Sequence, residues 1–153
     1  MENLRGKVIV VGLWSSKCEP SLYLLGELAK LQVRGATGGF EVFPVNFDRE
    51  RWRLINQFLK QERMKKMLAG VKLYTPALGV QGVHVFMDEV PTLPAFFIID
   101  RDGRFAVCGT GYKDWEVLRC LQAVLAEKAS EPAPAPEPIP AIAPAPLAIQ
   151  SKG

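Results

Sequence analysis

The sequence is poor in the residues that build metal sites and disulfide frameworks. Its 153 residues include three cysteines and one histidine, and no two cysteines form a Cys-x-x-Cys pair that would supply close zinc ligands. An odd number of cysteines in a chain long enough to bury a core argues against a disulfide-stapled scaffold and leaves at least one thiol free. We therefore expect no metal ion and no other cofactor.

Long hydrophobic runs and a strong charge imbalance are also lacking. No apolar run reaches the ~18 residues that a membrane span needs, so we expect no membrane-spanning helix. The formal net charge is only +3, and basic side chains gather only within residues 49–66, where a solvated helix face would have the same composition. This is a weak signal for nucleic acid, and we expect no nucleic-acid partner.

Length and composition predict one domain followed by a tail. A chain of 153 residues with 48% hydrophobic content can bury one core. After Ser130 proline alternates with small residues, a composition that favours extended, solvated polyproline II over helix or sheet. We expect a domain at residues 1–129 and a flexible, disordered tail at residues 130–153. A Pro-rich segment that binds an aromatic groove is the alternative reading of the tail.

The most informative stretch of the chain is its first apolar run and the turn after it. Val8–Leu13 is β-branched and wholly apolar, which is typical of a strand buried on both faces. Cys18 and Pro20 follow, and then leucines recur at helical spacing, so Cys18 lies at or just before a helix N-terminus. Amide N–H groups, the helix dipole and the neighbouring Lys17 would all stabilise a thiolate there. The pattern favours a reactive nucleophile over a buried, inert cysteine.

Hydrophobic periodicity predicts the elements in order. Strands are expected at residues 7–14, 40–47, 95–99 and 104–108, and helices at residues 20–33, 50–68 and 113–127. A glycine-rich loop is expected at 35–39 and a hairpin turn at 101–103, whereas residues 70–90 have no clear pattern. Pro44 cannot donate to a ladder and indicates an edge strand or a bend. The order β-α-β-α-β-β-α predicts an α/β fold with a central mixed sheet flanked by helices.

Two separated motifs resemble the thioredoxin superfamily. Residues 4–21, with Trp14-Ser15-Ser16-Lys17-Cys18-Glu19-Pro20-Ser21, are similar to the active-site stretch of bacterial TlpA-like thiol-disulfide oxidoreductases, whose motif is Trp-x-x-x-Cys-x-Pro-Cys. Residues 90–104 are similar to the family's cis-proline loop, its next strand and the hairpin turn after it. The motifs occur in the family's order, and the resemblance covers residues 4–127. It implies a thioredoxin fold.

The resemblance also implies roles for particular residues. Cys18 would be the catalytic nucleophile, and Ser21 stands where the family has its second cysteine. The cis-proline would be Pro94, facing Cys18, with the backbone of Leu93 open to an extended thiol substrate. The substrate-binding positions implied in this way are Trp14, Lys17, Pro20, Leu93, Pro94 and Gly111. For Trp14, a plain core residue is the equal alternative.

Two departures from the family bear on mechanism. A serine at position 21 cannot attack a mixed disulfide, so an exchange that Cys18 starts cannot be completed within the motif. Gly12 stands where many thioredoxins have a buried acidic residue that helps to move protons. Asp48 would partly substitute for that residue, although a solvated turn aspartate is the simpler interpretation. Cys120 is expected to pack in the core, and His84 is expected to be a structural or loop histidine and not a catalytic base. For Cys108, a resolving role is the less favoured alternative to an ordinary strand residue.

Two functions from different classes follow from these residues. The first is a monothiol thiol-disulfide oxidoreductase, in which Cys18 attacks a disulfide and an external thiol resolves the adduct. The second is a redox-inactive scaffold that holds an extended peptide in the groove beside Cys18 and Pro94. We expect a monomer whose partner is a thiol- or disulfide-bearing protein or a glutathione-like small thiol.

The start of the chain bears on localisation. Residues 1–5 lead at once into the first expected strand, without the features of a signal peptide. TlpA-like proteins usually have a signal or anchor before the corresponding stretch. The expectation is therefore the bacterial periplasm if such a segment has been removed, and the cytoplasm otherwise.

Overall fold

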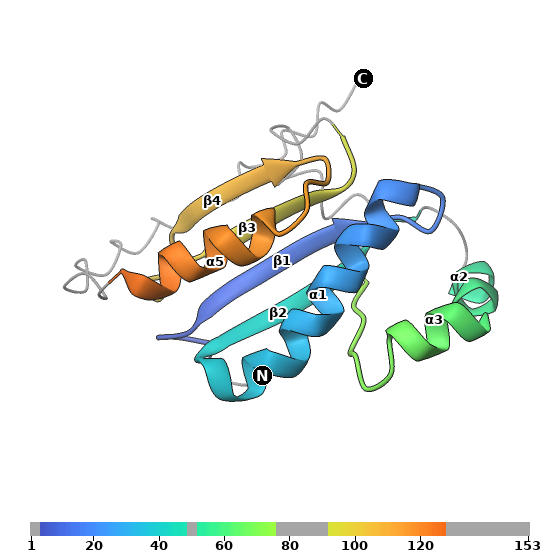
Figure 1. The fold of residues 1–153 in the computed structure, drawn as a ribbon, viewed down its shortest axis with the longest axis horizontal. Helices are drawn as coiled ribbons and strands as arrows, with labels where there is room; N and C mark the ends of the chain where they lie inside the picture. Colours follow the sequence, from blue (N-terminus) through green and yellow to red (C-terminus); the bar gives the residue numbers. More distant parts are fainter. Residues whose placement is uncertain (1–3, 49–51, 76–91, 128–153) are drawn as a thin grey trace, which may run out of the picture.

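The computed structural model describes residues 4–48, 52–75 and 92–127, and its centre is a four-stranded sheet (Figure 1). The strands are, in the spatial order β2-β1-β3-β4, β2 (Phe40–Asn46), β1 (Val8–Trp14), β3 (Ala95–Ile99) and β4 (Phe105–Thr110). β1 pairs in parallel with β2 and antiparallel with β3, and β4 pairs antiparallel with β3. The sheet is therefore mixed, as the order of elements predicts.

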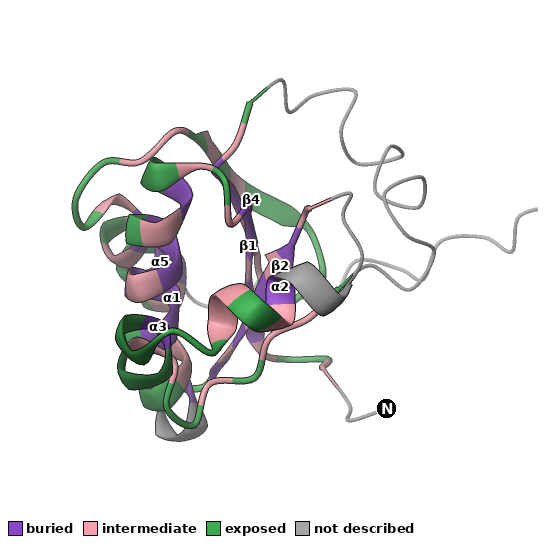
Figure 2. Cartoon of the chain, turned by 90° about the vertical axis from the view of Figure 1, so that its right-hand side faces the viewer, coloured by how far each residue is buried: buried purple, intermediate pink, exposed green. Residues whose placement is uncertain are grey.

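Helices cover one face of this sheet. α1 (Glu19–Gly38), α3 (Glu62–Met67) and α5 (Glu116–Ala126) lie on the same side of it (Figure 2). The buried residues of α1 and α5 pack against the strands, and α3 packs beside α1. α2 (Trp52–Leu59) lies near the end of β1, where Ile55 packs against Trp14. None of the helices in the described ranges is long and apolar enough to cross a membrane.

The two faces of β1 pack against different apolar clusters. On the helix side, Val8 and Val10 join the main core, whose other fully buried members are Leu24, Leu28, Leu31, Phe40, Val42, Phe96, Ile98, Val117, Leu121 and Val124. On the opposite side, Leu13 packs against Ala95. Because apolar neighbours lie on both faces, the strand is continuously apolar instead of alternating.

Pro44 lies on an edge strand, as predicted, and its missing N–H costs the sheet nothing. β2 is the outermost strand, and its outer edge bonds to Tyr74: the N–H of Asn46 donates to the Tyr74 carbonyl at 2.8 Å. Residues two apart in a strand direct their N–H groups to the same side, so the nitrogen of Pro44 also faces that outer edge. The carbonyl of Pro44 still accepts the Tyr74 N–H at 2.9 Å.

The glycine-rich loop predicted at 35–39 is wrong, because α1 continues to Gly38. The helix stays tight against the following strand: a Cβ at Gly35 would lie 2.8 Å from the carbonyl oxygen of Phe40, and one at Gly38 would lie 2.5 Å from the Phe40 ring. Glycine costs a helix interior about 1 kcal/mol, but here it permits this close packing. The helix ends at Gly39, whose φ of 73° is the left-handed conformation that glycine adopts at a helix C-terminus.

The single helix predicted at 50–68 is also wrong, because it is divided into α2 and α3. The chain turns at Gln61, which is extended with φ −62° and ψ 139°. Ile55 from α2 and Met67 from α3 both contact the cluster around Trp14. On one straight helix these two side chains would be separated by about 18 Å, so the break brings both to the same cluster.

The C-terminal part confirms the predicted hairpin and shortens the last helix. Asp100 donates its N–H to the carbonyl of Arg104 at 2.9 Å, and Gly103 has a φ of 84° in the turn. The helix predicted at 113–127 begins only at Glu116, because Trp115 before it has a left-handed φ of 63°. The predicted tail with its boundary near residue 130, most of the stretch 70–90 and His84 lie outside the described residues.

The N-terminus of α5 is capped by another helix. Trp115 has no side chain acceptor to offer, and the carboxylate of Glu27 on α1 instead accepts the N–H of Leu118 at 3.1 Å. Glu27 is buried, and its second carboxylate oxygen has no hydrogen-bond partner among the described residues. Burial raises the pKa of Glu27 more than the hydrogen bond from Leu118 lowers it. This contact joins α1 to α5 across the helical layer.

Candidate active site

Cys18 lies directly before α1, where the sequence places it. Its backbone is extended, with φ −113° and ψ 107°, and Pro20 occupies the first turn of the helix. The Cys18 N–H donates to the carbonyl of Ser15 at 3.3 Å, and the Ser21 N–H donates to the Cys18 carbonyl at 2.9 Å. The thiol is half-buried. It therefore lies at the positive end of the helix dipole, where an anion is stabilised.

The loop before β3 lies against this thiol. The Leu93–Pro94 peptide bond is cis, and the Cys18 Sγ lies 3.7 Å from the carbonyl oxygen of Leu93 although the residues are 75 apart in sequence. Pro94 is buried, and its own carbonyl accepts the N–H of Gly111 at 2.7 Å. Antiparallel pairing of β3 with β1 brings this loop to the end of β1. Cys18, Leu93, Pro94 and Gly111 thus form one contiguous site.

Asp48 fixes the turn that carries Cys18. β1 and β2 are parallel and Trp14 pairs with Asn46, so the residues that follow the two strands meet at one edge of the sheet. The Asp48 carboxylate accepts hydrogen bonds there from the hydroxyl of Ser15, from the N–H of Ser16 at 3.0 Å and from the amide of Asn46 at 3.0 Å. The same Ser15 hydroxyl accepts the Lys17 N–H at 3.2 Å.

These contacts decide how Asp48 behaves. Burial alone would raise its pKa, but the hydrogen bonds from Ser15, Asn46 and Ser16 outweigh burial and hold the pKa below its usual range. The carboxylate is therefore ionised and fully engaged as an acceptor. Two of the partners, Ser15 and Ser16, lie more than thirty residues away in the sequence, in the turn after β1. Asp48 therefore approaches the candidate site and is not merely a solvated turn residue, whereas its part in moving protons stays a prediction.

Ser21 and Trp14 are both buried and do not lie on the surface. Ser21 is 0% exposed, and its hydroxyl has no hydrogen-bond partner among the described residues. An unpaired buried hydroxyl costs about 1–3 kcal/mol. Trp14 is also 0% exposed and packs against Leu25 and Ile55. The substrate-binding role expected for Trp14 does not fit this burial, because its position in β1 directs the indole into the core.

Gly12 leaves no room for a buried acidic residue. A Cβ at this position would lie 2.2 Å from the Cδ1 of Leu28, so the leucine of α1 fills the space that a longer side chain would need. Lys17 and Pro20 are exposed, and Gly111 is half-buried with a φ of 77°. Their expected role in substrate binding stays a prediction.

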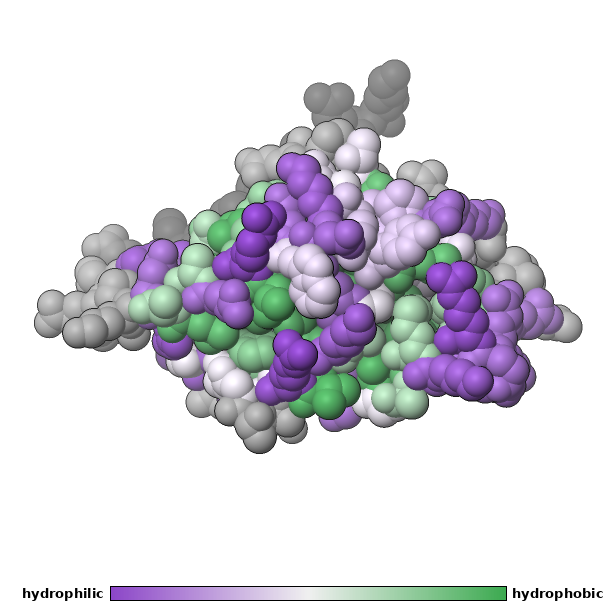
Figure 3. Space-filling view, in the orientation of Figure 1, coloured by the Kyte–Doolittle hydropathy of each residue, from purple (hydrophilic) through white to green (hydrophobic). Residues whose placement is uncertain are grey.

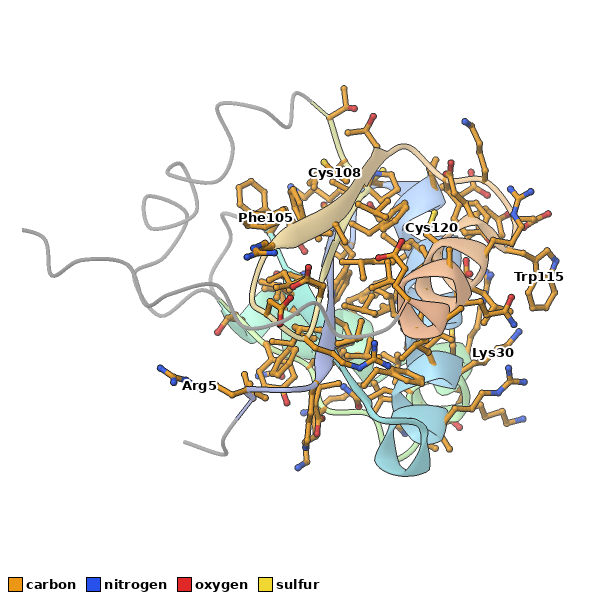
Figure 4. The ribbon with its side chains drawn as sticks, turned by 90° about the vertical axis from the view of Figure 1, so that its left-hand side faces the viewer. Arg5, Lys30, Phe105, Cys108, Trp115 and Cys120 are labelled. Carbon is orange, nitrogen blue, oxygen red and sulfur yellow. The ribbon has the colours of Figure 1, made fainter. Side chains whose placement is uncertain are left out.

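The other two thiols lie on different elements from Cys18, and the resolving role considered for Cys108 stays a prediction. None of the three cysteines forms a disulfide. Cys108 is an exposed residue of β4 that pairs with Phe97, and Cys120 lies on α5 (Figure 4). Cys120 packs against the main core, which confirms its expected packing role. The described part of the chain holds no cluster of His, Cys, Asp and Glu that could bind a metal ion.

Solved structures of other proteins have a similar fold. A protein from Chlorobium tepidum, assigned as the thiol:disulfide interchange protein DsbE, superposes with a TM-score of 0.63 and 25% identity over 78% of this chain and 81% of its own. The chain has a thioredoxin fold. A thiol-disulfide isomerase from Corynebacterium glutamicum shares the thioredoxin fold with a TM-score of 0.63 and 19% identity, over 82% of this chain and 84% of that one.

A third structure extends the likeness. StoA from Bacillus subtilis matches with a TM-score of 0.57 and 17% identity, over 77% of this chain and 83% of its own. Neither a scan against protein-family models nor a search of curated proteins finds a match. The likeness therefore rests on three-dimensional structure, and at these identities it establishes the thioredoxin fold.

Proposed function

We propose that this thioredoxin-fold protein is a thiol-disulfide oxidoreductase that works with a single catalytic thiol, Cys18. The observation that carries the proposal is the position of the Cys18 Sγ, at the N-terminus of α1 and 3.7 Å from the Leu93 carbonyl. Structural neighbours named as thiol:disulfide interchange and isomerase proteins support the same chemistry.

The reaction needs two exchange steps. In the first, the Cys18 thiolate attacks a substrate disulfide, a bond forms between Cys18 and one substrate sulfur, and the other sulfur leaves as a thiolate. In the second, an external thiolate attacks the substrate sulfur of the mixed disulfide, a disulfide forms between those two sulfurs, and Cys18 leaves as a thiolate. The external thiol must come from a glutathione-like molecule or a partner cysteine, because Ser21 has no sulfur with which to attack.

In this reaction the buried hydroxyl of Ser21 would stabilise the Cys18 thiolate. Ser21 lies three residues after Cys18, in the first turn of α1, and residues at that spacing share one face of a helix. Its hydroxyl lacks a partner among the described residues. Donation to the Cys18 thiolate would satisfy the hydroxyl and stabilise the anion.

A binding module is the second candidate, and the environment of Gly12 favours it. The space for a buried proton-transferring acid is filled by Leu28, and the second cysteine is absent. In this case the extended partner would occupy the same surface beside Leu93 without exchange. The monomeric state, the thiol-bearing partner and the cellular location stay predictions under either function.

Adduct formation with glutathione disulfide tests the proposal. We expect mass spectrometry to find one glutathione on the wild type and on the matched control Cys108→Ser/Cys120→Ser, and none on Cys18→Ser. Added reduced glutathione should then release the adduct. If the wild type forms no adduct at Cys18, the oxidoreductase proposal fails and the binding module becomes the better account.

A further inference from the structure

A groove lies in the helical layer, beside the thiol site. It has a volume of about 610 Å³ and is bordered by α1, α3 and the segment that leads into α5. An adjoining hollow of about 250 Å³ shares Glu27, Lys30 and Trp115 with it. Tyr112 lines the groove and directly follows Gly111, whose N–H binds the Pro94 carbonyl. The groove is therefore linked to the thiol site through two consecutive residues of one loop.

Positive charge gathers along this groove from two helices. α1 contributes Lys30 and Arg34, and α3 contributes Arg63 and Lys66. Among the described residues, Lys30, Arg63 and Lys66 form no ion pair. Figure 3 shows hydrophilic side chains bordering apolar ones on this face of the molecule.

The carboxylates in the groove are already engaged within the protein. Glu27 accepts the N–H of Leu118, and Asp114 accepts the hydroxyl of Tyr112 at 2.8 Å. The cations thus outnumber the carboxylates, and each carboxylate already accepts an internal hydrogen bond. The surplus is complementary to an anionic ligand.

Aromatic side chains line the same groove. The rings of Tyr23 and Tyr112 stack with centroids 5.7 Å apart. Trp115 is 58% exposed, and it projects on the same side of the molecule as Lys30 (Figure 4). Its φ of 63° is costly for a bulky residue, by about 1–3 kcal/mol. Exposed tryptophan and tyrosine are the residues that most often anchor protein partners.

We propose that this groove docks an extended, acidic segment of a partner protein, with an apolar or aromatic side chain of that segment packed on Trp115. Carboxylates of the segment would lie against Lys30, Arg63 and Lys66. The inference rests on the proposed function in one respect: the docked protein is the one whose disulfide or thiol reaches Cys18. Acidic flanking sequence would then select substrates that the small thiol site alone does not distinguish.

Fluorescence anisotropy with a labelled peptide of alternating glutamate and proline containing one phenylalanine tests the groove in the full-length protein. We expect saturable binding that weakens as salt screens the charges, and no binding of the same peptide with glutamine for glutamate. Lys66→Glu should weaken binding by about tenfold or more. Lys60→Glu, a matched change at an exposed lysine outside the groove, should leave it unaltered. Trp115→Gly should also weaken binding while keeping the fold, because glycine adopts this φ without strain.

Several outcomes would overturn the inference. Equal binding of the acidic and glutamine peptides, or unchanged binding by Lys66→Glu and Trp115→Gly, removes its basis. Tighter binding of a peptide of residues 131–147 would make the chain's own C-terminal segment the occupant. Self-association that Trp115→Gly abolishes would make the groove an interface between copies.

The two proposals can fail separately. Glutathione disulfide is too small to need the groove, so the groove variants should still form the Cys18 adduct. An adduct without specific acidic-peptide binding overturns the groove alone. Specific peptide binding without an adduct overturns the oxidoreductase proposal and leaves a binding surface.

Discussion

The hydroxyl of Ser15 donates a hydrogen bond to the carboxylate of Asp48, and this contact ties the end of β2 to the turn that carries Cys18. The same carboxylate accepts the Ser16 N–H. The turn is thereby held from a neighbouring strand and not only by its own backbone. Its position relative to Leu93 depends on an ionised group.

Asp48→Asn should therefore destabilise the protein in a pH-dependent way. The pKa of Asp48 is lowered on folding, so the unfolded state binds more protons as the pH falls. The stability that Asp48 contributes is present above the unfolded pKa of about 3.9 and is lost as the pH falls through the folded pKa. Urea unfolding at neutral pH should show a loss of about 1–3 kcal/mol for the variant. The difference from wild type should shrink in acid.

A matched control for this measurement is Glu62→Gln, which removes an exposed carboxylate that pairs with Lys65. We expect its effect to stay within about 0.5 kcal/mol at all pH values. An equal loss in the two variants would mean that the turn does not depend on Asp48.

Glu27→Gln should alter how stability depends on pH, with the opposite sign from the effect of Asp48→Asn. Burial raises the pKa of Glu27, so the folded state binds the proton more tightly than the unfolded state. Stability from this group is therefore present at low pH and declines as the pH rises through the folded pKa. Glutamine keeps an acceptor for the Leu118 N–H without the charge. The measurement is thermal unfolding from about pH 4, which is near the usual glutamate pKa of about 4.3, to about pH 8. Over this range the melting temperature should decline less in the variant than in wild type.

Glu27→Ala serves as the comparison, because it removes the acceptor together with the charge. Loss of a helix cap costs about 1 kcal/mol, so this variant should be less stable than Glu27→Gln. Equal stability of the two would show that the cap on α5 contributes little.

Cys18 should be the most rapidly alkylated of the three thiols near neutral pH. It lies at a helix N-terminus beside Lys17, whereas Cys120 packs against the core and Cys108 lies on β4. Iodoacetamide labelling followed by peptide mass spectrometry measures the three rates. If Cys108 or Cys120 reacts as fast as Cys18, the helix N-terminus confers no special reactivity.

Ser21→Cys should supply a second thiol that attacks the mixed disulfide at Cys18 within the same chain. Ser21 is buried in the first turn after Cys18 and its hydroxyl is unpaired among the described residues, so a thiol of similar size should not lower the melting temperature. The pre-reduced variant should reduce one insulin disulfide per chain without added glutathione, as its own two thiols become a disulfide, whereas wild type should require the external thiol. Cys18→Ser/Ser21→Cys is the control and should be inactive. A Ser21→Cys chain that forms the bridge yet remains inactive would argue for the binding module.

Local sequence patterns determined much of the fold and the position of the thiol. The hydrophobic pattern predicted strand β1, and the turn residues predicted the hairpin around Gly103. The missing N–H of Pro44 indicated an edge strand. The location of Cys18 before α1 followed from Pro20 and the leucines after it. Each of these features depends on neighbours within a few residues, which a single sequence displays directly.

Only the tertiary structure decided the features that join distant segments. α1 runs through the glycines before Gly39 because Phe40 packs against them, and the segment after β2 breaks at Gln61 so that both parts reach the cluster around Trp14. The Asp48 bond to Ser15 arises because parallel β1 and β2 end at the same edge of the sheet. The groove likewise gathers cations from two helices. Hydrophobic period specifies which face of an element is buried, but not which distant side chain lies opposite that face.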